Sequence, residues 1–261
     1  MIVVKFGGHV MRDQNRNFAK AITAALASGE SVVVVHGGGP QIDAALTLAG
    51  IDSTFIGGFR YTSPATFEIV ERVLVEQVGS AIAQVLSAGG IAAQAISGRT
   101  LPTLIATRKT TLVDGSTADL GQVGNVVAVD TSHITSLVAA GVVPVVAPIA
   151  ADSASGNGLN VNADLAAAAI AGALDASALI IMTDVAGIYR NWPDTQSLIS
   201  TISCAELASI QSSFTSGMAP KVQATLDAIA AGAKAVRIID GRDPHSFANA
   251  LSGHGGTLVS A

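Results

Sequence analysis

The sequence lacks several features that mark particular classes of protein. Its single cysteine, Cys204, excludes an intramolecular disulfide and a cysteine-rich metal site. We interpret it as a small buried hydrophobic residue. Charged residues make up 13% of the 261 residues, about half the usual share. The net charge of −5 argues against a nucleic-acid partner.

Long hydrophobic runs are also missing, although the mean hydropathy is +0.52. Glycine, aspartate, serine or lysine interrupts each apolar stretch before it reaches the roughly 18 residues that a membrane span needs. The N-terminus shows no basic region and no cleavage signal. We therefore expect a cytoplasmic protein with no membrane partner.

Familiar catalytic motifs are absent as well. There is no Gly-x-x-x-x-Gly-Lys-Ser/Thr phosphate loop, no Gly-x-Ser-x-Gly elbow and no His-Glu-x-x-His motif. The five histidines show no metal-ligand spacing, so we assign no metal ligand. His36, between a strand and glycines, is interpreted as structural. Lysines, glycine N–H groups, asparagines and an aspartate remain for chemistry, without an obvious general base.

The most informative feature present is a pair of glycine turns, each directly after a buried strand. Residues 32–36 are four valines and a histidine, and three glycines and an apolar helical pattern follow them. Residues 2–6 repeat the device, with Lys5 just before two glycines. Glycines let the backbone approach an anion, and a helix N-terminus adds partial positive charge. The two turns suggest a pocket for a phosphate that is being transferred.

Strands and helices alternate along the chain, which predicts an α/β protein. Two β-rich runs, 104–112 and 123–129, predict a hairpin excursion. The other predicted strands are 2–6, 32–36, 91–96, 142–147, 178–183, 235–239 and 257–259, and the predicted helices lie near 15–27, 40–49, 63–86, 131–140, 163–173 and 221–231. We expect one continuous three-layer αβα sandwich around a mostly parallel sheet. A lobe boundary near residue 175 gives lobes 1–175 and 176–261.

Two polar blocks open predicted helices. Asn160 to Asp164 could cap the alanine-rich helix, or hold a polar substrate and orient a cation. Lys221 lies in the first turn of its helix, where the helix dipole disfavours a cation. Its side chain is therefore expected to turn toward an anion, with a solvated surface lysine as the alternative. A carboxylate nucleophile would need no base, because its pKa near ~4 leaves it ionised at pH 7. Phosphoryl transfer to it requires only alignment and charge neutralisation.

Eight segments together resemble the amino acid kinase family, and within it the members that phosphorylate N-acetyl-L-glutamate. The resemblance covers essentially the whole chain. In the family's order and spacing, the segments are Lys5–Gly8, His36–Pro40, Gly57–Thr62, Asp119–Gly124, Asn160–Asp164, Thr183–Ile188, Gly217–Lys221 and Ile239–Arg242.

The resemblance implies a role for particular residues of this chain. The catalytic residues would be Lys5 and Lys221 on the transferring phosphoryl group, Asp164 organising both lysines, and Gly8 and Gly38 as N–H donors. Acetylglutamate would be held by Gly38, Gly39, Arg60 and Asn160, with Arg60 gripping its spare carboxylate. ATP would lie on the second lobe against Asp184, Val185, Ala186, Gly187, Ile188, Tyr189, Ser213, Phe214 and Thr215. Mg²⁺ would ride on the ATP phosphates, and the product would be N-acetylglutamyl 5-phosphate of arginine biosynthesis.

Two departures from the family pattern affect what is carried over. His9 stands where a smaller residue is expected. Members inhibited by arginine carry an extra N-terminal helix that links dimers into a hexamer, whereas Lys5 is four residues from the start here. We therefore expect an arginine-insensitive homodimer with the helix from Pro64 to Leu86 in its interface. Ordinary core packing of that helix is the alternative.

Two other functions remain open. One is a related kinase that acts on aminoadipate or glutamate displayed on a carrier protein, although the 14 Lys+Arg of a net acidic chain offer little docking surface. The segment around Arg60 and the Asn160 block favour free acetylglutamate. The other is a nucleotide- or amino-acid-sensing protein without turnover, for which the retained Lys5, Asp164 and Lys221 are not needed.

Overall fold

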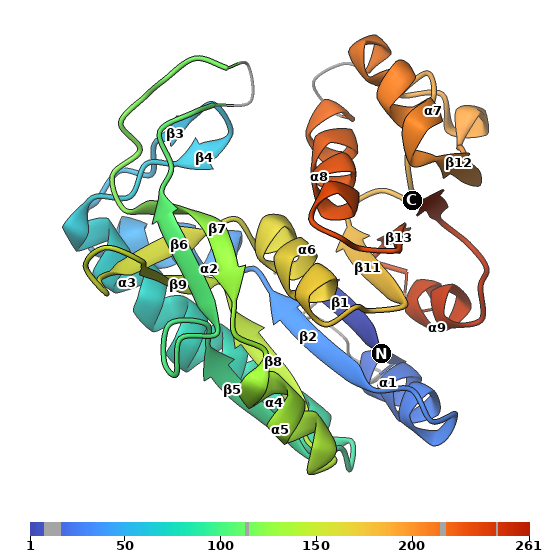
Figure 1. Ribbon diagram of the computed structural model, residues 1–261, viewed down its shortest axis with the longest axis horizontal. Coiled ribbons are helices and arrows are strands. Elements are labelled where there is room, and N and C mark those ends of the chain that lie inside the picture. The colour runs from blue at the N-terminus through green and yellow to red at the C-terminus, as the bar shows by residue number, and fades with distance from the viewer. Residues whose placement is uncertain (8–16, 113–114, 215–217, 244) are drawn as a thin grey trace.

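A central sheet of eight strands organises the molecule (Figure 1). The computed structural model describes residues 1–7, 17–112, 115–214, 218–243 and 245–261. In the sheet order β12-β14-β13-β11-β1-β2-β8-β5, every neighbouring pair is parallel except β13 with β14. The strands are β1 (Ile2–Phe6), β2 (Val32–His36), β5 (Ala93–Ser97), β8 (Val143–Ala147), β11 (Ala178–Thr183), β12 (Thr201–Ser203), β13 (Ala235–Asp240) and β14 (Thr257–Ser260). The predicted mostly parallel sheet is confirmed.

Helices cover both faces of this sheet, which confirms the three-layer arrangement. One apolar cluster joins the sheet to α1, α2, α3, α4 and α9, and the other joins it to α5, α6, α7 and α8. The helices are α1 (Asn17–Ala27), α2 (Gly39–Leu48), α3 (Pro64–Arg72), α4 (Ser80–Ala88), α5 (Ser132–Ala139), α6 (Ala163–Ala173), α7 (Cys204–Ser209), α8 (Ala219–Ala230) and α9 (Ser246–Leu251). In the described part of the chain, no helix combines the length and apolar character that crossing a bilayer requires.

The valine-rich strands are explained by burial on both sides. Successive side chains of a strand point to opposite faces, so a covered parallel sheet needs apolar residues at every position. Val3, Val33 and Val35 belong to the cluster with α6, whereas Val4 and Val34 belong to the cluster with α1. The two strands that carry the glycine turns are therefore anchored in both halves of the core.

A small closed barrel lies beside the sheet and corrects the prediction of one continuous sandwich. The predicted hairpin is present, because β6 (Leu104–Arg108) pairs antiparallel with β7 (Val123–Val129). Two strands that were not predicted, β9 (Ile149–Asp152) and β10 (Gly158–Val161), close the ring. Each has four residues and the polar segment 153–157 separates them, so neither shows a long apolar run. The barrel places β10 beside the candidate site.

The predicted helix 63–86 is present as three consecutive segments. Ser63 caps it by accepting a 3.1 Å hydrogen bond from the Thr66 N–H. A π-helical segment, η2 (Val73–Gly79), separates α3 from α4 and was not predicted. The predicted stripe of Phe67, Val70, Leu74, Val78, Ile82 and Val85 is buried except for the last residue. Core packing thus accounts for most of this stripe within the single chain.

Small residues let α6 lie against both the sheet and α8 (Figure 1). Four alanines of α6 are buried: Ala166, Ala167, Ala168 and Ala171. At the end of the helix, a Cβ atom on Gly172 would lie 1.9 Å from the Ala231 carbonyl oxygen. The glycine therefore fixes how closely α6 and α8 approach.

We expect Gly172→Ala to lower the free energy of unfolding by about 1–3 kcal/mol, as overpacking does. Helix propensity alone predicts the opposite sign, a gain of up to about 1 kcal/mol from replacing glycine with alanine. Urea unfolding followed by circular dichroism measures the difference. An unchanged or higher midpoint would show that the contact between α6 and α8 is not tight.

Candidate active site

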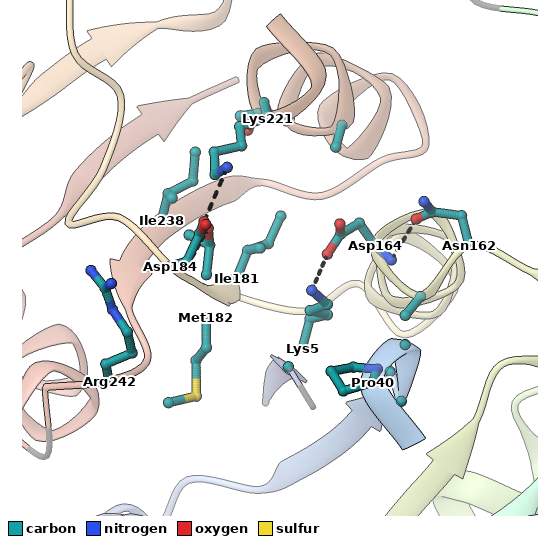
Figure 2. A pocket seen from close by; sticks show the side chains of 18 residues that line it. Lys5, Pro40, Asn162, Asp164, Ile181, Met182, Asp184, Lys221, Ile238 and Arg242 are labelled. Atoms are coloured by element: carbon teal, nitrogen blue, oxygen red, sulfur yellow. Dashed lines mark hydrogen bonds and ion pairs between the residues drawn. The ribbon is translucent and has the colours of Figure 1, made fainter. Parts of the chain in front are cut away.

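A pocket of about 450 Å³ lies over the carboxyl ends of the central strands. Parallel α/β sheets bind ligands at this edge, where the strand order changes direction. Figure 2 shows the side chains that line it, with Lys5 entering from β1 and Lys221 from α8. Gly38 and Asp184 also line it, after the ends of β2 and β11. The structure thus gathers residues that are far apart in the sequence.

Lys5 is held by Asp164. The Lys5 Nζ atom lies 3.0 Å from the Asp164 Oδ1 atom, and the two side chains are 15% and 27% exposed. Both side chains line the larger pocket, and the Asp164 Oδ1 atom that faces Lys5 is itself buried. Asp164 lies in the first turn of α6, where the helix dipole favours an anion. The pair fixes the ammonium group at the edge of the pocket.

The polar block from Asn160 to Asp164 was expected either to cap α6 or to hold a substrate, and the residue that caps α6 is Asn162. The Asn162 side-chain oxygen accepts hydrogen bonds from the N–H groups of Asp164 and Leu165, at 2.8 and 3.2 Å. Capping therefore needs only the middle residue of the three polar ones. Asn160 and Asp164 are left to face the two pockets.

Lys221 turns toward an anion, as its unfavourable position in the first turn of α8 predicts. Its Nζ atom lies 3.1 Å from the Asp184 Oδ1 atom, at the end of β11. Burial alone would raise the pKa of Asp184, but hydrogen bonds from Thr183 and Lys221 outweigh it and hold the pKa below its usual value. Each lysine thus has its own aspartate partner in the structure, and a role of Asp164 in organising both lysines stays a prediction (Figure 2).

A second pocket of about 190 Å³ adjoins the first and contains the predicted acetylglutamate-binding residues. Gly38, Gly39, Arg60 and Asn160 all line it. The two pockets share the glycine turn after β2. A ligand in the second pocket could therefore reach the lysines across this turn.

Backbone pairing brings Arg60 and Asn160 together. Arg60 ends the hairpin of β3 (Phe55–Ile56) and β4 (Phe59–Arg60). Two residues after Arg60, the Thr62 carbonyl oxygen accepts a 2.7 Å hydrogen bond from the Gln122 N–H. The Thr62 hydroxyl oxygen accepts a 3.3 Å hydrogen bond from the Asn160 side-chain amide. At Gly121, with φ +68, a Cβ atom would lie 2.2 Å from that carbonyl oxygen, so the position requires glycine.

Arg60 is buried and already has partners in the absence of ligand. It donates a 2.7 Å hydrogen bond to the Asp43 carboxylate of α2 and another to the Ser53 hydroxyl. Its guanidinium lies 4.7 Å from the centre of the Phe55 ring. A guanidinium has five N–H groups, so several remain available for a ligand carboxylate.

The predicted nucleotide residues occupy different surroundings. Asp184 lines the larger pocket, whereas Val185, Ile188 and Tyr189 are buried in the apolar core. Gly187 packs against Thr257, Ala186 is partly buried, Ser213 is exposed and Phe214 is buried. Thr215 falls outside the described residues, as does Gly8, which was predicted as a catalytic N–H donor. A nucleotide-binding role for this set stays a prediction.

Arg242 is a pocket residue to which the sequence analysis gave no role. It follows β13, and its guanidinium makes two hydrogen bonds to the Asp240 carboxylate, at 2.9 and 2.8 Å. The signal in the sequence was the run Asp240-Gly241-Arg242 directly after a predicted strand. Among the described residues, no group of three His, Cys, Asp or Glu side chains is placed to hold a metal ion.

The sequence profile of the amino acid kinase family matches residues 1–240. The chain belongs to the amino acid kinase family. Members of this family are phosphotransferases, which agrees with a pocket lined by lysines and glycine turns. This amino acid kinase is similar over most of its length to relatives named acetylglutamate kinase. The relative from Salinispora tropica is 44% identical over 247 residues, which cover 94% of this chain and 83% of the relative.

A further relative and two solved structures are also similar to the chain. The acetylglutamate kinase of Nocardia farcinica is 43% identical over 264 residues, covering 100% of this chain and 87% of the relative. A solved structure from Streptococcus mutans superposes with a TM-score of 0.81 at 27% identity, covering 100% of this chain and 98% of that one. Carbamate kinase from Giardia shares the fold, with a TM-score of 0.68 at 19% identity, over 99% of this chain and 98% of that one.

The contact between Arg60 and Asp43 makes a prediction about acid behaviour. The hydrogen bond from Arg60 is the main cause that holds the pKa of Asp43 below its usual value, and Ser53 adds less. We expect Arg60→Gln to raise this pKa toward 3.8, and Ser53→Ala to raise it less. A carboxyl ¹³C NMR titration measures both.

The same pair has a defined effect on stability. An Asp whose pKa is lowered by folding stabilises the native state above its unfolded pKa, and this contribution is lost as the pH falls through the folded pKa. Arg60→Gln should therefore weaken the acid dependence of unfolding. An unchanged Asp43 pKa in Arg60→Gln would show that the observed contact does not persist in solution.

Proposed function

We propose that this chain transfers the γ-phosphoryl group of ATP to the side-chain carboxylate of N-acetyl-L-glutamate. The products are N-acetylglutamyl 5-phosphate and ADP, a step of arginine biosynthesis. The observation that carries the proposal is the junction of the two pockets at Gly38. Lys5 and Lys221, each paired with an aspartate, line the larger pocket. Arg60 and Asn160 line the smaller one.

The chemistry requires alignment more than proton transfer. A carboxylate oxygen of the substrate attacks the γ-phosphorus, a new P–O bond forms, and the bond to the ADP oxygen breaks with its electron pair. Because the acceptor is already ionised, no side chain has to remove a proton. Negative charge on the transferring group is balanced by the ammonium groups of Lys5 and Lys221 and by the Gly38 N–H.

The two lobes would divide the substrates between them. In this proposal, residues 1–175 hold acetylglutamate through Gly39, Arg60 and Asn160, and residues 176–261 hold ATP near Asp184. The arrangement of the pockets supports this division, because Arg60 and Asn160 line only the smaller one and Asp184 only the larger one. Arg60 would bind the carboxylate that does not react, which is the contact that distinguishes acetylglutamate from a monocarboxylate.

Magnesium would enter with the nucleotide. The described residues bring a single carboxylate to each lysine and no three-ligand group, so the donor set suits a cation carried by the ATP phosphates. Bound there, Mg²⁺ would supply additional neutralisation of phosphate charge.

A homodimer through α3, η2 and α4 remains a prediction. Most of the apolar stripe of this long helix is buried in the core of the single chain, whereas Val85 is 41% exposed. Size-exclusion chromatography with light scattering measures the mass of the assembly. A dimer agrees with the expectation, and a monomer or a hexamer contradicts it.

Trapping of acyl phosphate with hydroxylamine tests the proposed function. The purified protein is incubated with Mg-ATP and one acceptor at a time: acetylglutamate, glutamate, aspartate, carbamate or carrier-bound aminoadipate. We expect hydroxamate with acetylglutamate alone. A signal only with the carrier-bound acceptor would favour the related carrier-dependent kinase, and silence with ATP still bound would favour a sensor.

Lys221→Ala should lower kcat by about 10²–10³-fold while the KM for acetylglutamate changes little, because the lysine acts mainly as charge develops in transfer. Lys234→Ala is a matched control, since Lys234 pairs with Asp175 through an exposed contact before β13. The control should keep the parent kcat. Unchanged turnover in Lys221→Ala would remove this lysine from the mechanism.

A further inference from the structure

His36 is the last residue of β2, directly before the glycine turn that joins the two pockets. It is fully buried, and burial lowers its pKa to about 4. The ring is therefore neutral near pH 7 and carries one proton. None of the catalytic roles described above uses it.

The hydrogen bond of the ring identifies the nitrogen that carries the proton. The Nδ1 atom lies 3.1 Å from the Gly37 carbonyl oxygen. A carbonyl oxygen can only accept, so Nδ1 is protonated and donates. Among the described residues, the Nε2 atom has no hydrogen-bond partner. This is the neutral form with the proton on Nδ1.

The donated hydrogen bond also orients the next N–H group. The Gly37 carbonyl and the Gly38 N–H belong to one planar trans peptide, so they point in opposite directions. Holding the carbonyl toward the buried ring turns the Gly38 N–H away from it. Gly38 lines both pockets, and its N–H donates no hydrogen bond within the described residues.

The π-helical segment η2 packs against His36 and Gly38, on either side of the Gly37 carbonyl. A Cβ atom on Gly79 would lie 3.1 Å from the His36 Nε2 atom, so this glycine makes room for the ring. A Cβ atom on Gly38 would lie 2.7 Å from Leu74 and 3.2 Å from Val78. A π-helical turn shifts the side chains that follow it by one residue, and such turns are frequent at functional sites. Here it brings three of its residues against His36 and Gly38.

We propose that His36 is a positioning residue: through the Gly37 carbonyl, it aims the Gly38 N–H at the transferring phosphoryl group. This rests on the proposed phosphotransfer function for its catalytic consequence. The imidazole itself contacts neither substrate. Its placement, packed between β2 and η2, keeps the N–H donor preorganised before substrates bind.

The protonated nitrogen is tested without any substrate. Long-range ¹H–¹⁵N NMR on ¹⁵N-histidine-labelled protein reports the tautomer of His36, assigned by its loss in His36→Asn. We expect the form protonated on Nδ1 between pH 6 and 8. A ring protonated on Nε2, or a doubly protonated ring in that range, would overturn the proposal.

The consequence for catalysis is tested by kinetics of acyl phosphate formation. His36→Leu removes the donor and should lower kcat by about 10–100-fold, less than the loss of a whole oxyanion donor, with both KM values within about threefold. His36→Asn places an amide N–H near the position of Nδ1 and should recover most of that loss. Gly79→Ala keeps the imidazole but pushes against it, and should lower kcat to an intermediate value.

Matched controls separate this role from general stability. Thr103 is also fully buried and also donates to a backbone carbonyl, so Thr103→Val controls for the loss of a buried hydrogen bond. It should keep the parent kcat. A folded His36→Leu with parent kcat, or a His36→Asn as impaired as His36→Leu, would refute the assignment.

An inactive wild-type protein would instead refute the proposed function. The placement of the N–H group is then read from the ¹H–¹⁵N signal of Gly38 during titration with inorganic phosphate. A shift in the wild type that disappears in His36→Leu supports the positioning role. A shift of equal size in both proteins contradicts it.

Discussion

The ion pair between Lys5 and Asp164 is the interaction on which the arrangement of the site depends. It joins the end of the central strand β1 to the first turn of α6 across the edge of the sheet. A partly buried charge is costly without a partner, and the helix dipole adds to the stability of this carboxylate. From α6, the close contact at Gly172 leads to α8, whose first turn carries Lys221 against Asp184. One chain of contacts thus sets the positions of both lysines relative to the sheet.

The second property of the site is the sharing of one glycine turn between two pockets. The turn after β2 lines both of them, and it leaves no room for a side chain at Gly38. A phosphoryl donor and a carboxylate acceptor bound on either side of it would meet over the same backbone N–H group. In the proposed function Arg60 would select the acceptor, and its contacts with Asp43 and Phe55 hold the guanidinium in place at the smaller pocket.

Much of the fold could be predicted from the sequence because a covered parallel sheet leaves a strong periodic signal. Strand 178–183 and helix 163–173 were predicted to the residue. Several of the missed elements depend on distant partners. The four-residue strands β9 and β10 pair with β6 and β7, and the π-helical segment packs against Gly38 and His36. Local patterns carry no information about such contacts.

The same distinction holds for the candidate site. The glycine turns, both lysines, Arg60 and the Asn160 block stood out as short segments next to predicted elements, and the structure brings them to one edge. The partners of the lysines did not follow from the sequence, since the pairing of Lys221 with Asp184 depends on how α8 packs against α6 and β13. That Asn162 is the residue that caps α6 likewise required its hydrogen bonds to be seen.

In the proposed function, the transferring phosphoryl group lies between Lys5 and Lys221. A crystal structure with ADP, Mg²⁺, aluminium fluoride and N-acetylglutamate tests this most directly, because the fluoride complex mimics the phosphoryl group in transfer. The predicted result has the aluminium fluoride within hydrogen-bond distance of both ammonium groups and of the Gly38 N–H, with the spare carboxylate of acetylglutamate on Arg60. A complex in which either lysine stays on its carboxylate partner and away from the fluoride, or in which acetylglutamate binds elsewhere, would contradict it.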